Sequence, residues 1–322
     1  MLCKYTIILT GPTATGKTRL GIRIARKIGP SAILSVDSRQ IYRHMDIGTA
    51  KPTAEERGEI EHYFIDVKEP DEPYSAGTFG KEARRRIESL WRRGKIPILV
   101  GGSGMYLQAV IDGFFEDSDE CGALREHLRR RHCREGTKVL YEELRRLDPK
   151  TAAGLGPNDA PRILRALELV HSGRRMRKEH PAAPLEGTVL MFGLTMERAE
   201  LYRRIDQRVD RMISDGLIDE VEGLVEKGYG RACPAMNTLG YGEILDYLEG
   251  RCDLERAVER IKSGSRRYAK RQWSWFRRDR RIRWLELDRW GIEGVEKRVI
   301  AQWQAEIGGG DEKRFFPVDS ER

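Results

Sequence analysis

The sequence predicts an α/β protein in which a parallel sheet is flanked by helices and the chain carries an inserted all-helical domain. Three observations lead to this prediction. Short apolar segments rich in β-branched residues alternate with segments of helical periodicity early in the chain. A glycine-rich loop joins the first apolar segment to the first helical one. Further along, residues 116–186 are strongly charged and helical in periodicity, with no strand candidate among them.

The apolar pattern predicts four strands and two crossover helices in the core. The strands are short and bounded by turn residues, as buried parallel strands usually are. After the fourth strand the periodicity predicts helices almost to the end of the chain. The predicted strands are Tyr5–Thr10, Ala32–Val36, Ile96–Val100 and Val189–Leu194, and the predicted helices between them are Lys17–Ile28 and Thr78–Arg93.

This pattern divides the chain into four parts. Residues 1–115 form the first part of the α/β core, and residues 116–186 form the helical insertion. Residues 187–307 complete the core with a helical, basic C-terminal region. Residues 308–322 begin with three consecutive glycines and carry mixed charge, which is typical of a disordered tail.

The composition predicts a cytoplasmic protein without a membrane span. The 322 residues include 59 Lys and Arg against 51 Asp and Glu, a net charge of +8, and the hydrophobic content of 39% is sufficient for a core. No segment approaches the ~18 to 20 uncharged apolar residues of a membrane helix. Five cysteines without a CxxC pair indicate free thiols in a reducing compartment. We expect a monomer that does not bind membranes.

The loop after the first strand matches the phosphate-binding pattern GxxxxGK[ST] at every fixed position. Its backbone N–H groups and the following helix N-terminus attract phosphate oxygens, Lys17 supplies a positive charge, and the Thr18 hydroxyl can bind Mg²⁺. The loop therefore predicts a P-loop NTPase-like core, an Mg²⁺ cofactor and a bound diphosphate. The diphosphate-binding residues are Gly11, Pro12, Thr13, Ala14, Thr15, Gly16, Lys17 and Thr18.

Asp37 ends the second predicted strand, at the sheet edge where ligands of open parallel sheets bind. Three roles are open to it on spacing alone: an Mg²⁺ ligand, a general base, or a turn-forming aspartate. Another glycine-dense turn, Gly101–Gly104, follows the third strand at the same edge. This turn is a weak indication of function, because tight turns use glycine for geometry alone.

Basic and aromatic residues are interleaved between Lys262 and Arg283, where ten Lys and Arg accompany a single acid, Asp279. Cations neutralise phosphates and aromatic rings stack on unpaired bases, so this segment predicts RNA binding, with Arg266, Lys270 and Arg271 as contacts. For each tryptophan, core packing is the competing interpretation. The insertion is also rich in arginine, including Arg162 and Arg165.

Three functions accommodate a diphosphate loop together with an RNA-sized basic surface. One is an enzyme that modifies RNA with a diphosphate-activated group. Another is a small-molecule kinase that transfers a phosphoryl group from ATP. A third is a remodelling protein driven by nucleotide hydrolysis, for which we find no apolar strand ending in Asp-Glu.

Nine ordered sequence blocks between Tyr5 and Arg278 together resemble the tRNA dimethylallyltransferase family, also called the tRNA isopentenyltransferase or IPP transferase family. The blocks are GPTATGKT from Gly11, DSRQIY from Asp37, GTAKP from Gly48, YSAGTF from Tyr74, GGSGMYL from Gly101, NDAPRILRALE from Asn158, LYRRIDQRVDRM from Leu201, LGYGEI from Leu239 and SRRYAKRQWSWFRR from Ser265.

The resemblance implies transfer of a dimethylallyl group from dimethylallyl diphosphate to the exocyclic N6 amine of the adenosine 3′ to the anticodon, in tRNAs that read codons beginning with U. It implies that Asp37 is the general base and that Arg208 contacts the diphosphate, beside Lys17 and Thr18. It also implies that the insertion contacts the anticodon stem-loop. The implied tRNA-contacting residues are Asp37, Ser38, Arg39, Gln40, Ser103, Pro161, Arg162, Ile163, Leu164 and Arg165.

The chain departs from the family pattern at a few positions. Ser103, Ser265 and Ser274 stand where the family usually has threonine, and the hydroxyl is kept. Gly242 stands where the family often has lysine, so no phosphate contact is expected from that position.

Overall fold

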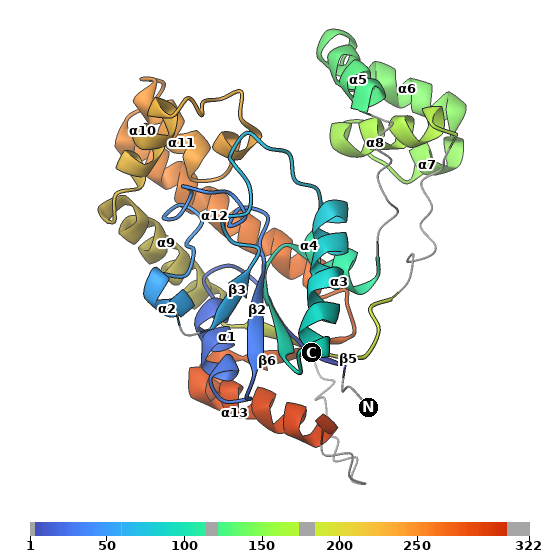
Figure 1. Ribbon diagram of the computed structural model, residues 1–322. Helices are drawn as coiled ribbons and strands as arrows, with labels where there is room; N and C mark the ends of the chain where they lie inside the picture. The colour runs from blue at the N-terminus through green and yellow to red at the C-terminus, as the bar shows by residue number, and fades with distance from the viewer. Residues whose placement is uncertain (1–3, 59, 114–121, 174–183, 308–322) are drawn as a thin grey trace. The chain divides into compact units, whose positions relative to one another are not determined.

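The computed structural model describes residues 4–58, 60–113, 122–173 and 184–307. The chain separates into two compact units (Figure 1). Residues 1–111 together with 185–322 form the first unit, and residues 112–184 form the second. The second unit begins and ends a few residues earlier than the predicted insertion. The predicted tail, residues 308–322, lies outside the described residues.

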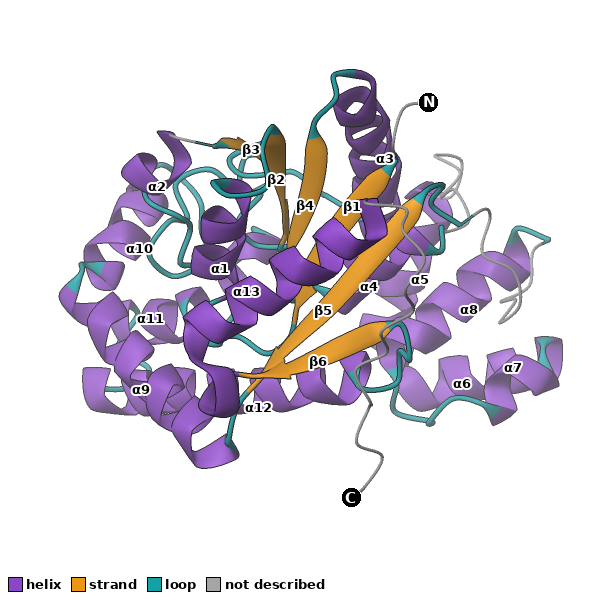
Figure 2. Cartoon of the chain, turned by 90° about the horizontal axis from the view of Figure 1, so that it is seen from below, coloured by secondary structure: helices purple, strands orange, loops and turns teal. Residues whose placement is uncertain are grey.

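The described part of the first unit contains a six-stranded sheet in the order β3-β2-β4-β1-β5-β6, with every neighbouring pair parallel (Figure 2). The central strand β1 lies between β4 and β5, so its Ile8 is paired with Leu99 on one side and Met191 on the other. This architecture confirms the predicted fold class. The strands are β1 (Tyr5–Thr10), β2 (Ser31–Val36), β3 (Glu61–Tyr63), β4 (Ile96–Gly101), β5 (Thr188–Thr195) and β6 (Ile282–Glu286).

The two edge strands were not predicted. β3 has only three residues, and none of them is fully buried. β6 lies in a segment that we predicted to be helical, and that prediction was wrong. The surrounding arginines hid the short strand, because an edge strand keeps charged side chains such as Arg283 in solvent while Ile282 and Leu285 are buried.

The helices of the first unit include one long helix, α12. The helix α13 is kinked at Gly291, which has a positive φ of 57°. The helices are α1 (Lys17–Ala25), α2 (Ala54–Gly58), α3 (Ala76–Arg92), α4 (Gly104–Ile111), α9 (Arg198–Ser214), α10 (Leu217–Glu226), the 3₁₀ helix η2 (Pro234–Asn237), α11 (Tyr241–Leu248), α12 (Leu254–Phe276) and α13 (Leu287–Ile307).

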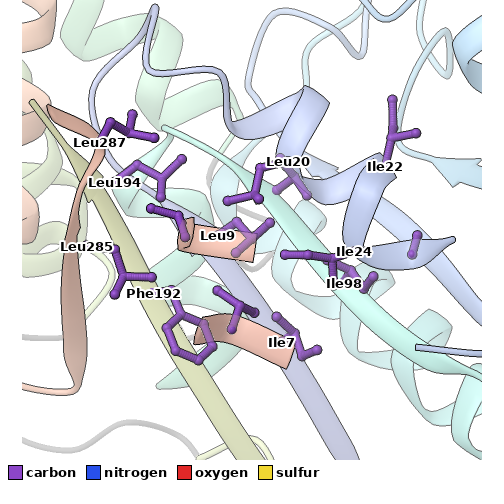
Figure 3. Packing of buried hydrophobic residues seen from close by; sticks show 14 of the residues in the cluster. Ile7, Leu9, Leu20, Ile22, Ile24, Ile98, Phe192, Leu194, Leu285 and Leu287 are labelled. Carbon is purple, nitrogen blue, oxygen red and sulfur yellow. The ribbon is translucent and has the colours of Figure 1, made fainter. Parts of the chain in front are cut away.

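Alternate residues of each strand enter two different apolar cores, one on each face of the sheet. On one face, Ile7 and Leu9 of β1 pack with Leu20 of α1 (Figure 3). The same cluster includes Val295 of α13. On the other face, Ile8 packs with residues of α3 and α4, among them Phe79, and with Phe276 at the end of α12. The two cores therefore fix the positions of β1 and the start of α1. The glycine-rich loop connects these two elements.

A third apolar cluster joins α9, α10, α11 and α12 to the segment after β2. Its fully buried members include Ile41 and Met45 from that segment, Leu217 from α10 and Tyr241 from α11. The segment that carries Asp37 is thus anchored to helices far away in the sequence.

The second unit has its own core. Leu128, Leu140 and Ile163 are buried in a single cluster, so this unit is stabilised by packing among its own helices. Among the described helices of the whole chain, none is both long and apolar enough to cross a membrane. The helices of the second unit are α5 (Gly122–Glu135), α6 (Thr137–Leu147), α7 (Pro149–Ala153) and α8 (Ala160–His171).

Candidate active site

The glycine-rich loop connects β1 to α1 as the sequence predicted, and its backbone conformation explains the glycines. Gly11 has φ of 128°, and a Cβ there would lie 2.5 Å from the carbonyl oxygen of Leu194 on β5. Gly16 has φ of 80° and caps α1 without any side-chain hydrogen bond to the first turn. The free N–H groups at the start of α1 are therefore available to an anion.

Lys17 folds back over the loop. Its ammonium donates a hydrogen bond of 2.5 Å to the carbonyl oxygen of Pro12 and lies 3.5 Å from the hydroxyl of Thr15. Burial, and to a smaller extent the charge of Arg208, lower the pKa of Lys17 to about 7, although the carboxylate of Asp37 opposes the shift. The amine of Lys17 is therefore shielded from water. The negative charge of a phosphate bound at the loop would stabilise its protonated form.

Arg208 reaches the same loop from α9. Its guanidinium donates a 3.2 Å hydrogen bond to the hydroxyl of Thr13, and burial lowers its pKa while the charge of Asp37 raises it. Two cations and one carboxylate from three distant segments therefore lie within electrostatic reach of one another. This places Arg208 beside the predicted diphosphate site, although the role that the family resemblance implies for it stays a prediction.

Asp37 follows β2 and is only partly buried. One carboxylate oxygen accepts a 2.9 Å hydrogen bond from the backbone N–H of Arg39, which is the geometry of a turn-forming aspartate. Among the described residues, the other oxygen has no hydrogen-bond partner. Ser38 also approaches the β4 end, since its N–H donates to the hydroxyl of Ser103 at 3.1 Å. The turns after β2 and β4 are therefore joined, as the predicted sheet edge requires.

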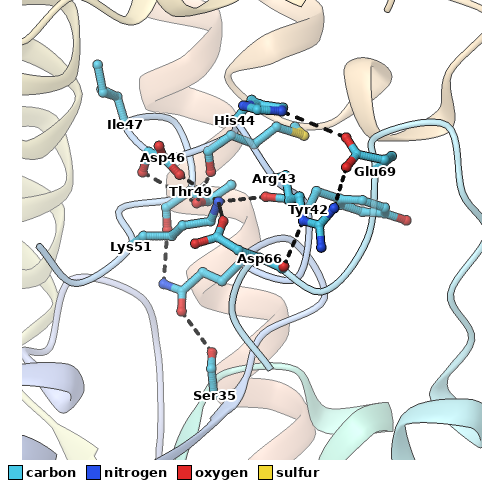
Figure 4. Close-up of polar contacts among 12 residues, drawn as sticks. Ser35, Tyr42, Arg43, His44, Asp46, Ile47, Thr49, Lys51, Asp66 and Glu69 are labelled. Carbon is cyan, nitrogen blue, oxygen red and sulfur yellow. Dashed lines mark hydrogen bonds and ion pairs between the residues drawn. The ribbon is translucent and has the colours of Figure 1, made fainter. Parts of the chain in front are cut away.

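Gln40 has a different position from the one we expected of a tRNA contact. Its side chain is buried, with 8% of its surface exposed, and accepts a hydrogen bond from Ser35. Its amide group donates to the carbonyl oxygens of Thr49 and Ala50 (Figure 4). Because all of these partners are internal, we assign Gln40 to holding the segment after β2 rather than to binding RNA.

The same segment is held by two further polar anchors. The ammonium of Lys51 is almost fully buried and pairs with Asp46 and Asp66, both at 2.6 Å (Figure 4). From α10, the carboxylate of Glu220 accepts the backbone N–H groups of residues 46–48 and the hydroxyl of Tyr241. A Cβ on Gly48 would lie 2.5 Å from the Tyr241 ring, so the GTAKP block is explained by close packing.

Two polar residues of α12 reach the site and were not predicted. The phenol of Tyr268 lies beside Ser103, and burial together with the charge of Asp37 raises its pKa to about 12. Gln272, one helical turn further on, contacts the phosphate loop itself. Their spacing of four residues places both side chains on one face of α12, and this was the available sequence signal.

The adjoining, exposed face of α12 is cationic and lines an open pocket of about 520 Å³. Arg267, Lys270 and Arg278 have no carboxylate partner within the described part of the chain. Arg271 lies over the ring of Tyr268, 5.6 Å from its centre. We call this surface the outer face of α12. It is lined by Arg267, Lys270, Arg271, Ser274, Trp275 and Arg278.

The aromatic residues of this segment divide between packing and exposure. Trp273 and Trp284 contact each other with ring centres 4.5 Å apart, which agrees with core packing. Trp275 is 40% exposed and lies against Gly104, where a Cβ would approach the indole nitrogen to 2.3 Å. Arg266 pairs with Asp206 and Glu259, so the structure favours its neighbour Arg267 as an RNA contact.

In the second unit the predicted RNA contacts also separate into two groups. Pro161 and Arg162 are exposed at the start of α8, and Leu164 and Arg165 are partly buried. Ile163 is completely buried in the core of the unit, so its side chain does not face solvent, and the RNA contact expected of it stays a prediction. Arg162 and Arg165 pair with Asp159 and Glu168, which reduces their charge toward a ligand.

A parallel sheet with a loop of the pattern GxxxxGK[ST] after its central strand is the arrangement typical of P-loop α/β proteins, here with a helical unit inserted before β5. A family model described as IPP transferase matches residues 40–279. The chain belongs to the IPP transferase family, and this confirms the resemblance seen in the sequence.

Individual relatives are similar over nearly the whole chain. A protein from Carboxydothermus hydrogenoformans, named tRNA dimethylallyltransferase, is 44% identical over 92% of this chain and 96% of its own length. The tRNA dimethylallyltransferase of Geobacillus thermodenitrificans is 44% identical over 87% and 90%.

Two solved structures are similar in fold as well as in sequence. The tRNA delta(2)-isopentenylpyrophosphate transferase of Staphylococcus epidermidis matches with a TM-score of 0.70 and 37% identity, over 94% of this chain and 99% of the other. A eukaryotic dimethylallyltransferase, described as acting on tRNA, matches with a TM-score of 0.81 and 28% identity, over 96% and 81%.

Proposed function

We propose that the protein transfers the dimethylallyl group of dimethylallyl diphosphate to the N6 amine of the adenosine 3′ to the anticodon in tRNA and releases pyrophosphate. The observation that supports this proposal is that Asp37 lies within electrostatic reach of two cations, Lys17 of the glycine-rich loop and Arg208 of α9. The names of the relatives support the same activity. In this proposal the tRNAs are those that read codons beginning with U.

The reaction requires an acceptor that is deprotonated and a donor whose leaving group is stabilised. The adenine amine is a weak nucleophile because its lone pair is delocalised into the ring. Asp37 accepts the proton of the amine as the C–N bond forms. General-base catalysis of this kind typically raises the reaction rate by ~10²- to 10⁴-fold. The allylic C–O bond breaks, and its electron pair leaves with the pyrophosphate.

The growing charge on the pyrophosphate is balanced by groups that the loop already holds. Lys17 exchanges its contact with the Pro12 carbonyl for a phosphate oxygen, and Arg208, which donates a hydrogen bond to the hydroxyl of the neighbouring Thr13, supplies a second cation. The N–H groups at the start of α1 complete the anion site. These contacts strengthen as the bond breaks, which is what lowers the barrier.

Mg²⁺ fits this site through the substrate rather than through a protein cage. Among the described residues no group of three or more acidic, histidine or cysteine side chains is placed to hold a metal. Mg²⁺ commonly binds to substrate phosphates with only one or two protein ligands, and the Thr18 hydroxyl at the start of α1 is the ligand we propose. The ion supplies positive charge to the leaving group when bound.

RNA binding is assigned to the exposed polar residues near the reacting carboxylate and to the outer face of α12. Arg39 is exposed next to Asp37, and Ser38 and Ser103 share a hydrogen bond at the same edge. The exposed residues Pro161 and Arg162 of the second unit are proposed as contacts to the anticodon stem-loop. An adenosine in a single-stranded loop is unstacked at a cost of only a few kcal/mol, which suits a recessed site.

The activity is tested with an unmodified tRNA anticodon stem-loop, Mg²⁺ and one of two donors. Pyrophosphate release and a heavier adenosine in the RNA are expected with dimethylallyl diphosphate only. A phosphorylated product or phosphate release with ATP would instead indicate the kinase, and no reaction with either donor would contradict an enzymatic role. A second RNA with guanosine at the target position is the control, and it should not be modified.

A further inference from the structure

The side chain of Gln272 joins the phosphate loop to the turn after β4. Its carbonyl oxygen accepts a 2.8 Å hydrogen bond from the backbone N–H of Thr13. Its amide nitrogen donates a 3.0 Å hydrogen bond to the carbonyl oxygen of Gly102. Only 6% of its surface is exposed, so both bonds are largely shielded from water. Buried bonds of this kind are costly to lose, because the backbone groups left behind have no alternative partner.

The surroundings of Gln272 are shaped to admit it. A Cβ on Gly102 would lie 2.1 Å from the amide nitrogen, so only glycine leaves room for this contact. Thr13, which Gln272 holds through its backbone, is also the residue whose hydroxyl accepts the hydrogen bond from Arg208. One residue of the phosphate loop is thus fixed from two sides, by α12 and by α9.

We propose that Gln272 is a positioning residue for the diphosphate site. It holds Thr13, and with it the curvature of the phosphate loop and the contact of Arg208, in the arrangement that binds the leaving group. The inference rests on the proposed function of the loop. It adds that α12, which carries the RNA-facing cations on its outer face, is also a structural part of the diphosphate site through its inner face.

The test compares three variants for binding of pyrophosphate and of an RNA anticodon stem-loop. Gln272→Leu removes both hydrogen bonds at similar volume. Gln272→Glu keeps the acceptor but donates to Gly102 only when its carboxyl group is protonated. Gln207→Leu makes the same chemical change at an exposed position on α9 and serves as the matched control.

We expect Gln272→Leu to weaken pyrophosphate binding by about tenfold, and RNA binding by less than about twofold. For Gln272→Glu we expect a dependence on pH, because burial raises the pKa of a carboxyl group and the protonated form imitates the amide. Its pyrophosphate affinity relative to wild type should approach unity near pH 5.5 and fall about tenfold by pH 8. Gln207→Leu should match wild type at both pH values.

The proposal is overturned if Gln272→Leu binds pyrophosphate as wild type does, or if RNA binding falls by the same factor. Should Gln272→Leu fail to fold, the Glu variant decides: a ratio to wild type that does not change with pH overturns the proposal. Wild-type protein that binds no pyrophosphate counts against the loop assignment itself. Failure of prenyl transfer with normal pyrophosphate binding counts against the proposed reaction and leaves the test of Gln272 intact.

Discussion

The two faces of α12 contain polar groups of opposite character. On the inner face, Tyr268 and Gln272 are largely enclosed, and Gln272 makes specific hydrogen bonds to the turns that follow β1 and β4. On the outer face, Arg267 and Lys270 are exposed and lack carboxylate partners within the described residues. The inner face therefore fixes geometry through a few shielded bonds, whereas the outer face supplies charge to a ligand that arrives from solvent.

We therefore expect residues of the inner face to affect the reaction rate and residues of the outer face to affect RNA affinity. A shielded group near the reacting atoms acts on the transition state, so changing one such residue has a large effect on rate. Exposed cations act additively on a polyanion and are weakened by salt, so several must be changed before affinity falls strongly. The following predictions test this separation in order of expected effect.

The largest effect is expected from the substitution Asp37→Asn, in the site that the inner face of α12 contacts. The amide cannot accept the amine proton, so turnover should fall by at least ~10²-fold while tRNA affinity changes little. Single-turnover rates and RNA binding measured on the same preparation check this. A variant with normal turnover but a higher Mg²⁺ requirement would move Asp37 to a metal-binding role.

The second prediction concerns three cations of the outer face, changed together as Arg267→Gln, Lys270→Gln and Arg271→Gln. RNA affinity should fall by roughly 10- to 100-fold at low salt, and the log-log salt dependence should flatten by about 0.7 for each lost contact to single-stranded RNA. Pyrophosphate binding should be unchanged.

The matched control for that prediction removes the same charge from α3, where Lys81, Arg85 and Arg92 are exposed. If neutralising these three residues to Gln lowers RNA affinity and the salt slope equally, net charge alone explains the binding, and the outer face has no special role.

A smaller effect is expected from Trp275, the exposed aromatic residue among these cations. Stacking of a base on an aromatic ring contributes about 1–3 kcal/mol, so Trp275→Ala should weaken RNA binding by about 5- to 100-fold, with the lower end expected for a ring that is more than half covered. Trp275→Phe should retain most of the affinity because it keeps a stacking surface. Equal losses in both variants would indicate that the indole acts by packing on Gly104 instead.

The smallest expected effect is the uptake of a proton by Lys17 when pyrophosphate binds. Because burial lowers the pKa of Lys17 to about 7, the amine is mostly neutral at pH 8. The bound anion raises that pKa, so protonation accompanies binding and affinity declines as pH rises above 7. Calorimetry in buffers of different ionisation enthalpy should detect the uptake of up to about one proton for each pyrophosphate that the wild-type protein binds. The Lys17→Met variant should lack this uptake. Equal uptake in both proteins would assign the proton to another group.

Prediction from sequence succeeded where the signal was local. The strand, loop and helix around Gly11–Thr18 were predicted correctly, because their residues are consecutive and their chemistry is specific. It failed at β6, where Arg283 and its neighbours hid a strand held only by pairing with β5. The sequence also did not show that Gln40 is buried or that Arg266 forms ion pairs, since burial and ion pairing with distant residues are invisible in one sequence.

By itself the sequence determined four of the six strands in their order along the chain, the GxxxxGK[ST] loop and the excess of cations near the C-terminal end, because these depend on periodicity, motif spacing and composition. Only the tertiary structure decided that Arg208 and Gln272 meet at Thr13, and which arginines remain without a carboxylate among the described residues. The physical reason is that parallel strands bring their carboxyl ends to one edge, where α9 and α12 pack against loops far away in the chain. Packing, rather than sequence spacing, sets those distances.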